Sequence, residues 1–527
     1  MKIVSLFFIP VFYLFAQSPT IESDARVGFE SIKADDLRRF DTYLSSDELQ
    51  GRETSYPGQK LAANYIAEHF KSLGLKPIGD NGTYLQHYDV ELTRVSDKSK
   101  ITVKTPGTSD SFSWLKDFYT FGGRDTSVHG SVVFAGYMDN ALDDSMKSKL
   151  AGKVVMVFSG QRRAPNDTVS IQLFRRIPQF RPDPTAAATI IIMDNDGPAS
   201  YARLSAQLAA FGILKGRMRL KGEETSRPIR ATPLMFYASP SIAEAILKPQ
   251  GKSLEGVRQM AFKDSVFAPL TIDDAVISIN TSVVNEERHA ENVVGLLEGS
   301  DPVLKKQVVV FSAHFDHLGV SENGAIYHGA DDDGSGTSMV MDLALAFSKN
   351  PVRPKRSLLF LAVSGEEKGL LGSSFYTSHP IVPLDETIAD FNTDMIGRMD
   401  TAHERTNNVA YTYLIGSDKI STELDSVLQV ANNETENIQL DYTYDSPNDP
   451  NHFYTRSDHY NFAKRGVPIA FFFTGVHADY HRPTDTVDKI LFDRIVKIGH
   501  VVYYAGWKTA NFDRMFTKNV KSSEYQQ

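Results

Sequence analysis

The 527-residue sequence predicts an α/β fold, a sheet flanked by helices, with a separate β-rich module inserted into it. Two apolar runs of buried-strand type, 308–313 and 357–363, flank a segment, 337–347, whose apolar residues recur at helical spacing. Between about residues 112 and 280 the sequence pattern changes to short β-rich runs that are separated by glycines, prolines and polar loops. Strands that alternate with helices indicate an α/β domain, and the length of the chain indicates at least two domains.

Acidic residues and histidines follow the places where the apolar runs end, which is where open α/β sheets build their sites. One pair follows the first run at i, i+2 spacing, a Glu-Glu pair follows the second, and three acids precede the predicted helix. A further acid follows the run 388–391, and a late histidine lies in the turn-like segment YHRPTDT. The candidate site residues are His314, Asp316, Asp332, Glu366, Glu367, Asp394 and His481.

Histidine and carboxylate side chains, in a chain without cysteine, form a nitrogen and oxygen ligand set. Such a set suits zinc or another divalent ion of the first transition row. The number of candidate ligands exceeds the three that usually hold one catalytic zinc, which is explained if one carboxylate bridges two ions. The pattern therefore predicts a two-metal site that activates water and polarises a carbonyl group.

These motifs resemble the zinc-dependent exopeptidase family that includes secreted bacterial aminopeptidases, glutamate carboxypeptidase and the transferrin receptor. In that family an H-x-D, a G-A-D-D-N/D-x-S-G, an E-E, an L-D-M-like aspartate and a late histidine form the site. This chain carries all five in order, with Asp333 where asparagine is common and Asn392-Thr393-Asp394 in place of the Leu-Asp form. The resemblance covers roughly residues 30–90 and 285–510, and neither departure removes a ligand.

The resemblance implies two Zn²⁺ per chain, with Co²⁺ or Mn²⁺ as substitutes. Its four terminal ligands would be His314, Glu367, Asp394 and His481. Asp332 would bridge the two ions, Glu366 would be the general base, and Asp316 would orient the imidazole of His314. Among the nearby histidines, His317, His328, His459 and His477 are expected to surround the ligands or line the substrate pocket.

The expected activity is that of an aminopeptidase acting on peptides. A glutamate carboxypeptidase-like enzyme or dipeptidase with the same metal core is the alternative, and a glutaminyl cyclase is a weaker one. A receptor of the transferrin-receptor type is disfavoured because all five ligand positions are filled. A serine hydrolase is not supported, since neither G-x-S-x-G nor the H-E-x-x-H of single-zinc proteases occurs.

The resemblance also implies a mixed, mostly parallel sheet and an inserted protease-associated domain. The expected organisation is a signal peptide at 1–16, an N-terminal part of the peptidase domain at 17–111, the insertion at 112–280, the catalytic domain at 281–515 and a tail at 516–527. The signal peptide is expected because one lysine precedes an apolar run too short to span a bilayer comfortably, with Ala16 before Gln17. Secretion or a periplasmic location would follow, without stable membrane insertion after cleavage.

The formal net charge of −9 argues against a nucleic-acid partner. A local exception is the segment 161–230, in which twelve Lys and Arg stand against six Asp and Glu. Charge runs usually face water, so a solvated surface is the expected interpretation. A lid that favours acidic substrates is the alternative. The oligomeric state and the residue preference are not predicted.

Overall fold

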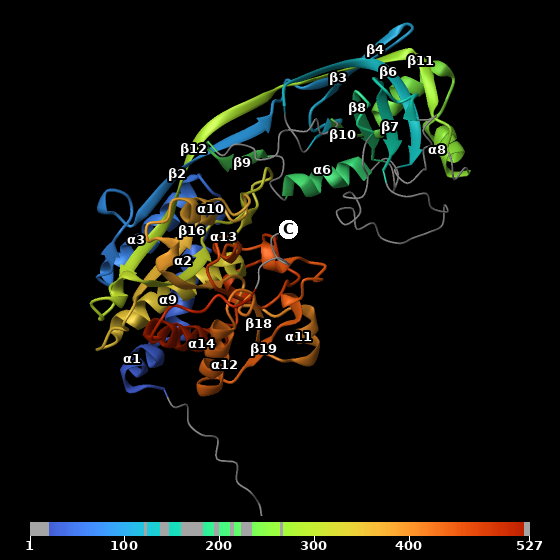
Figure 1. Cartoon of the computed structure of the whole chain (residues 1–527). Coiled ribbons are helices and arrows are strands. Elements are labelled where there is room, and N and C mark those ends of the chain that lie inside the picture. Colours follow the sequence, from blue (N-terminus) through green and yellow to red (C-terminus); the bar gives the residue numbers. More distant parts are fainter. Residues whose placement is uncertain are drawn as a thin grey trace, which may run out of the picture. The chain divides into compact units, whose positions relative to one another are not determined.

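The computed structural model describes residues 21–120, 124–137, 147–159, 183–193, 200–210, 215–222, 234–263 and 267–520. The chain forms two compact units (Figure 1). The first comprises residues 1–88, 290–320 and 326–527, and the second comprises residues 89–289 and 321–325. The segment expected as an insertion, 112–280, falls within the second unit, whereas the expected signal peptide lies outside the described residues.

The first unit is built on a mixed sheet whose central strands are parallel. The central order is β20 (Ile469–Phe473), β17 (Thr387–Thr393), β13 (Val308–His314) and β16 (Ser357–Val363). These strands pair in parallel, whereas β12 (Val283–Leu297) pairs antiparallel to β16 and β18 (Tyr411–Ile415) antiparallel to β20. The outer strands that belong wholly to this unit are β19 (Gln439–Asp441) and β1 (Lys76–Pro77). The strand order of the same sheet also includes β2 (Leu85–Val95), which passes into the second unit at residue 89, and β9 (Arg217–Leu220), whose residues belong to the second unit. The expected α/β class, with a mixed sheet flanked by helices, is confirmed.

Alternate residues of the central strands belong to two separate cores, because successive side chains of a strand point to opposite faces. Phe311 and Phe360 pack into the larger core, which includes residues of α9 and α14, whereas Val310 and Leu361 pack into the smaller core, which includes residues of α10 and α13. Both faces are therefore buried, which explains why these strands read as continuous apolar runs. The helices of this unit are α1 (Ser23–Ser31), α2 (Ala34–Leu44), α3 (Pro57–Ser72), α9 (Gly336–Lys349), α10 (Leu371–Ser378), α11 (Thr401–Thr406), α12 (Thr422–Glu434), α13 (His459–Lys464) and α14 (Phe492–Asn511).

Within the described residues, the second unit has its own eight-stranded sheet and its own apolar cores. The strand order is β4 (Thr108–Ser113), β3 (Lys100–Thr105), β11 (Leu270–Thr281), β6 (Thr126–Tyr137), β7 (Val154–Phe158), β8 (Ala188–Ile192), β10 (Met235–Ala238) and β5 (Phe118–Tyr119). Its helices are α6 (Ser200–Ala210), α7 (Pro240–Leu247) and α8 (Leu254–Lys263). The β-rich character predicted for this part of the chain is confirmed, and its resemblance to a protease-associated domain stays a prediction.

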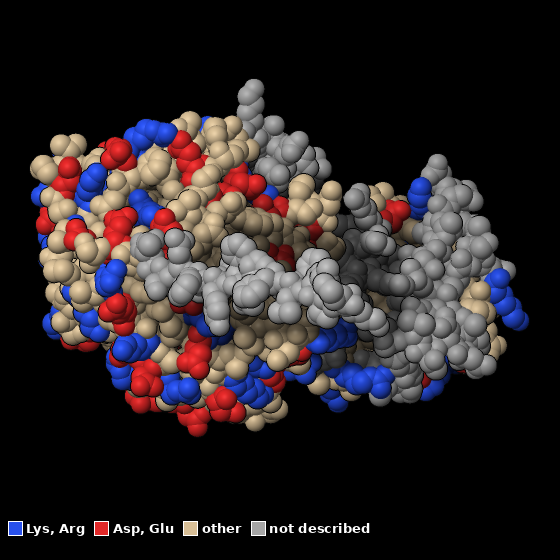
Figure 2. Space-filling model, turned by 90° about the horizontal axis from the view of Figure 1, so that it is seen from below, with Lys and Arg blue, Asp and Glu red and all other residues tan. Residues whose placement is uncertain are grey.

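Most of the basic segment 161–230 lies outside the described residues. Within the described part, Arg219 pairs with Glu91 at 2.6 Å and Lys221 pairs with Glu287 at 2.6 Å. On the face shown in Figure 2, Lys and Arg are interspersed with Asp and Glu among the coloured residues. Among the helices of the described ranges, none has both the length and the apolar character needed to cross a bilayer.

Phe311 occupies the middle of the larger core. Its ring lies 5.5 Å from that of Phe347 and 5.6 Å from those of Phe360 and Phe391, measured between centroids. On the helix side, a Cβ placed on Gly506 would come within 2.4 Å of its Cζ, so α14 can approach this closely only because residue 506 is glycine. Phe311 therefore connects strands β16 and β17 with helices α9 and α14.

We predict that Phe311→Ala lowers the free energy of unfolding by about 3–5 kcal/mol, because the substitution leaves a cavity in a close-packed core. Denaturant unfolding in a Trp114→Phe background measures this, since Trp507 of the first unit is then the remaining tryptophan. Val303→Ala is the control, because Val303 is 72% exposed and its change should stay within about 0.5 kcal/mol. Equal effects of the two substitutions would contradict the prediction.

Candidate metal centre

The candidate ligands converge at the carboxyl ends of the parallel strands of the first unit. His314 is the last residue of β13, and Asp394 directly follows β17. Glu367 follows β16, and His481 lies in the loop after β20. Asp332 belongs to the turn Ala330–Ser335 that precedes α9. This is the edge of an open α/β sheet at which sites are generally built.

A first group of ligands gathers around His314. Its Nε2 lies 3.3 Å from Oδ1 of Asp332 and 3.5 Å from Oδ1 of Asp394. Ligand atoms of these three residues all lie within 4.8 Å of one another, and all three residues are buried. Ser457 fixes the far side of Asp394, because its Oγ donates a hydrogen bond of 2.7 Å to Oδ2. We define His314, Asp332 and Asp394 as the first subsite.

A second group uses the other oxygen of the same aspartate. Nε2 of His481 lies 3.0 Å from Oδ2 of Asp332 and 3.2 Å from Oε2 of Glu367. Asp332 thus directs one oxygen to each histidine, as a carboxylate that bridges two ions requires. We define Asp332, Glu367 and His481 as the second subsite.

Asp316, which is predicted to orient the imidazole of His314, also contacts residues other than His314. Its Oδ1 lies 3.7 Å from Nδ1 of His314, while the nearer contact of that nitrogen, at 3.2 Å, is with the backbone oxygen of Asp316. The carboxylate also accepts hydrogen bonds from Thr54 Oγ1 at 2.6 Å and from the backbone N–H of Glu366 at 3.2 Å. Asp316 therefore connects the His314 loop to the predicted base, and its effect on the imidazole of His314 stays a prediction.

The two adjacent glutamates have opposite pKa shifts. Burial raises the pKa of Glu366 well above its ordinary value; His314 opposes this shift, and Glu367 and Asp394 add to it. For Glu367, burial acts upward and so does Asp332, but His481 and His317 together outweigh them, so that the pKa is lowered to about 2. Environments that separate the pKa values of two neighbouring carboxyl groups indicate different roles. Glu367 is suited to remain an ionised ligand, and Glu366 is suited to exchange a proton.

The residues of this cluster fit a pair of divalent cations. Buried atoms His314 Nε2, Asp332 Oδ2 and Glu367 Oε1 make no hydrogen bond, although such atoms are normally satisfied in proteins. The neighbouring acids hold protons on the imidazoles, since Glu367 and Asp332 raise the pKa of His481 to about 11 against the effect of burial. Bound cations would replace these protons, because ligating histidines are neutral. With nitrogen and oxygen donors only, zinc is a suitable occupant.

Two residues that sequence reasoning did not single out hold the turn that carries Asp332. Asp485 accepts the backbone N–H of Asp331 at 3.0 Å and that of Asp332 at 3.2 Å. Arg52 is fully buried and donates to the backbone oxygens of Phe315 at 2.7 Å and of Gly329 at 2.9 Å. The loop around Arg52 reads only as polar and glycine-containing, so nothing in its sequence indicates these long-range contacts.

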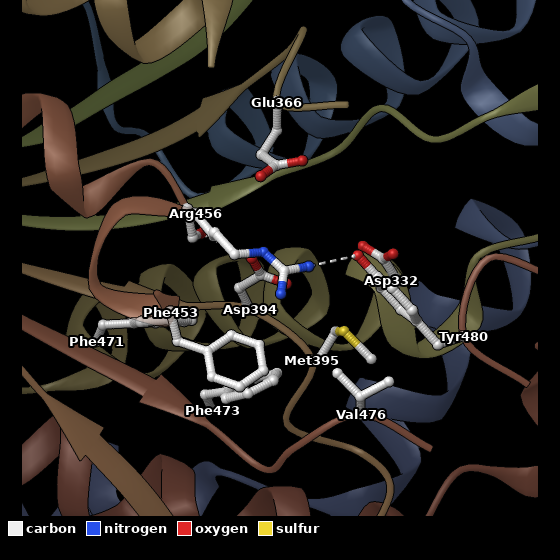
Figure 3. A pocket seen from close by; sticks show the side chains of 11 residues that line it. Asp332, Glu366, Asp394, Met395, Phe453, Arg456, Phe471, Phe473, Val476 and Tyr480 are labelled. Atoms are coloured by element: carbon white, nitrogen blue, oxygen red, sulfur yellow. Dashed lines mark hydrogen bonds between the residues drawn. The ribbon is translucent and has the colours of Figure 1, made fainter. Parts of the chain in front are cut away.

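A pocket opens beside the first subsite (Figure 3). Asp332, Asp394 and Glu366 line its acidic wall, and Met395, Phe453, Phe471, Phe473 and Val476 supply apolar lining. Figure 3 shows the guanidinium of Arg456 projecting into this space and donating to the hydroxyl of Tyr480, at 3.3 Å. The pocket thus combines an acidic wall, an apolar surface and one exposed cation.

Two of the other histidines near the motifs support the site from outside it. His459 stacks on Phe471, a pocket residue, with 4.4 Å between ring centroids. His477 lies 3.2 Å from Oδ2 of Asp331. His328 binds Asp47 at 2.8 Å, away from the ligands. His317 is different, because it lies against the second subsite at 2.9 Å from Oε1 of Glu367.

The segment that carries the site is similar to known peptidases. Residues 292–506 match the model of peptidase family M28, and this match includes the segment that carries the site. Aminopeptidase YwaD of Bacillus subtilis (strain 168) is 26% identical over 232 residues, covering 43% of this chain and 46% of that protein. The chain thus spans about half the length, or less, of the first curated relatives that it matches.

Solved structures show the same fold over nearly the whole chain. An aminopeptidase from Aneurinibacillus sp. strain AM-1 has a TM-score of 0.56 at 17% identity, covering 95% of this chain and 99% of that one. BSAP, a zinc aminopeptidase from Bacillus subtilis, has a TM-score of 0.52 at 17% identity, covering 94% and 98%.

We predict that Asp485→Ala weakens divalent metal binding by about 10–100-fold, because the turn that carries Asp332 loses its acceptor for two backbone N–H groups. Titration of the chelator-treated protein with Zn²⁺ measures the change. The matched control is Asp488→Ala, at a carboxylate in the same loop for which no contact with Asp331 or Asp332 is seen. Unchanged affinity in Asp485→Ala would show that the turn holds its shape without this residue.

Proposed function

We propose that the chain is a two-zinc aminopeptidase that hydrolyses the N-terminal peptide bond of peptides. The observation that carries this proposal is the pair of histidine–carboxylate groups that share Asp332, beside a pocket lined by Glu366. The relatives reported above support it, since they include proteins named as aminopeptidases and leucine aminopeptidases.

Zinc, when bound, polarises a carbonyl group and lowers the pKa of a bound water molecule. His314, Asp394, Glu367 and His481 would hold the ions as terminal ligands, and Asp332 would bridge them. Glu366 would take up a proton from the attacking water and return it to the leaving amine. The backbone N–H of Glu366 donates to Asp316 at 3.2 Å, and its side chain lines the pocket.

The expected preference for the amino end of a peptide rests on the names of the relatives. The charge of the pocket does not decide it, because bound cations would neutralise Asp332 and Asp394, two of the carboxyl groups that line it. The apolar lining, with three phenylalanines, suits an apolar side chain on the first residue. We therefore propose a preference for peptides that begin with an unblocked apolar residue.

Arg456 supports a second candidate, a dipeptidase or glutamate carboxypeptidase-like enzyme. Its guanidinium projects into the pocket, and the hydrogen bond to Tyr480 uses only one of its five donors. A guanidinium is well suited to a carboxylate of the substrate. The two candidate enzymes share the metal centre and differ in which end of the peptide substrate they recognise.

The experiment compares aminoacyl-4-nitroanilides with N-blocked peptides and with peptides that end in glutamate, for the wild type and for Glu366→Gln. We expect hydrolysis of unblocked substrates alone, and in the variant a kcat lower by about 10²–10⁴-fold with both metals retained, because the base is lost and no ligand is. Val303→Ala is the control variant, because Val303 is exposed and neither lines the pocket nor belongs to the candidate ligands. If blocked peptides with a C-terminal acid are the preferred substrates, the dipeptidase or glutamate carboxypeptidase-like assignment replaces the aminopeptidase assignment. If no peptide is hydrolysed although metals are bound, a glutaminyl cyclase is favoured.

We also propose that the protein is secreted or periplasmic. Support comes from the first sixteen residues, in which Met1-Lys2 precedes an apolar run that ends near Ala16. Expression in a secreting bacterial host followed by N-terminal sequencing is the test, and we expect the mature protein to begin at Gln17. Retention of Met1 on a membrane-bound product would indicate an uncleaved anchor instead.

A further inference from the structure

We propose that His317 is an additional ligand of the second subsite, which would thereby hold its ion more tightly than the first subsite does. The proposal rests on the proposed function in one respect, that the cluster is a metal centre. It adds a sixth ligand residue to the five already described. It also assigns different roles to the two ions, since one would be held more tightly and the other would keep an open coordination position.

The position of His317 is that of a ligand. Its side chain is fully buried, and its Nδ1 lies 2.9 Å from Oε1 of Glu367 and 3.9 Å from Oδ2 of Asp332. Ligand atoms of His317, Asp332 and Glu367 all lie within 4.8 Å of one another. The ring of His481 is 5.9 Å away and inclined by 69°. Two imidazoles and two carboxylates therefore surround the same space.

The hydrogen bonding of His317 is incomplete. Neither ring nitrogen makes a hydrogen bond, so the short contact with Glu367 is not aligned as one. The atoms that Nδ1 faces, Oε1 of Glu367 and Oδ2 of Asp332, also lack hydrogen bonds. Buried polar atoms without partners are costly, and those around a metal ion are satisfied by the ion. Three such atoms facing one another indicate one shared occupant.

The ring of His317 is held in place independently of any ion. The backbone N–H of His317 donates to the backbone oxygen of Arg52 at 3.2 Å. On the other side the ring packs against Gly329, where a Cβ would come within 2.5 Å of its Cγ. Because the ring is already held in this position, His317 could bind a metal ion with little loss of side-chain entropy.

The two subsites then differ in how many protein ligands they offer. The first has three, His314, Asp332 and Asp394, and the second has four. Zinc sites with four protein ligands are typically closed, whereas catalytic sites with three keep a position open. The pocket agrees with this division, because Asp394 and Glu366 line it whereas Glu367 and His481 do not. The open position therefore belongs to the first subsite, and the second ion is the more firmly retained.

The first test is a Zn²⁺ titration of the full chain after metal removal, in competition with a chromophoric chelator. For the wild type we expect two ions with distinct affinities. Loss of a residue that only supports a metal ligand by a hydrogen bond lowers metal affinity by roughly 10–100-fold. In His317→Ala the affinity of the tighter site should fall by more than this, and the affinity of the weaker site should be unchanged. His328→Ala is the matched control, since this histidine of the same loop binds Asp47 and should leave both affinities unchanged.

The second test counts the histidine ligands directly. In the Co²⁺-loaded wild type, proton NMR should show three exchangeable, paramagnetically shifted imidazole N–H signals, and in His317→Ala two. Two signals in the wild type would overturn the proposal without any variant. Recovery of full affinity by His317→Gln, which can donate a hydrogen bond but is a poor ligand, would also overturn it.

These readouts separate failure of this proposal from failure of the proposed function. A wild type that binds two ions and whose tighter site is insensitive to His317→Ala overturns the sixth ligand alone. Two bound ions with three histidine signals, but no peptide hydrolysis, overturn the proposed activity alone. A wild type that binds no divalent ion overturns both.

Discussion

The position of a single carboxylate, that of Asp332, determines whether this site can hold two ions. Its two oxygens face two different histidines, at 3.3 Å and 3.0 Å, so a rotation that favours one subsite disrupts the other. A side chain with this role cannot stand on a mobile loop. The backbone around it is accordingly fixed on one side by Asp485 and on the other by Arg52.

The ligands themselves are positioned by the sheet. Because β13, β17 and β20 run in parallel, their carboxyl ends meet at one edge, and residues far apart in sequence become neighbours there. The strands are buried on both faces, which makes this edge rigid. The acids supply more negative charge than the histidines can compensate, and this imbalance is what divalent cations would relieve.

The fold class could be predicted from local patterns, namely apolar runs of strand length that alternate with a helical segment. The same patterns placed acids and histidines at the ends of the runs, whereas the choice of Asp332 among three adjacent acids and the role of each ligand came from the family resemblance and stay predictions. The supports could not be predicted in this way, because Arg52 and Asp485 act through contacts with backbone atoms that leave no pattern in the sequence. His317 was expected only near the ligands, since a histidine that follows H-x-D by one position can point toward the metal or away from it.

Arg52 also determines when the site can form. The segment that matches the peptidase family begins at residue 292, yet Arg52, which holds the turn before α9, and Thr54, which binds Asp316, precede it by more than two hundred residues. At the other end, His481 and Asp485 come late in the chain. During synthesis, the first and last of these residues are separated by the entire second unit. A nascent chain therefore has no assembled site until His481 and Asp485 have left the ribosome.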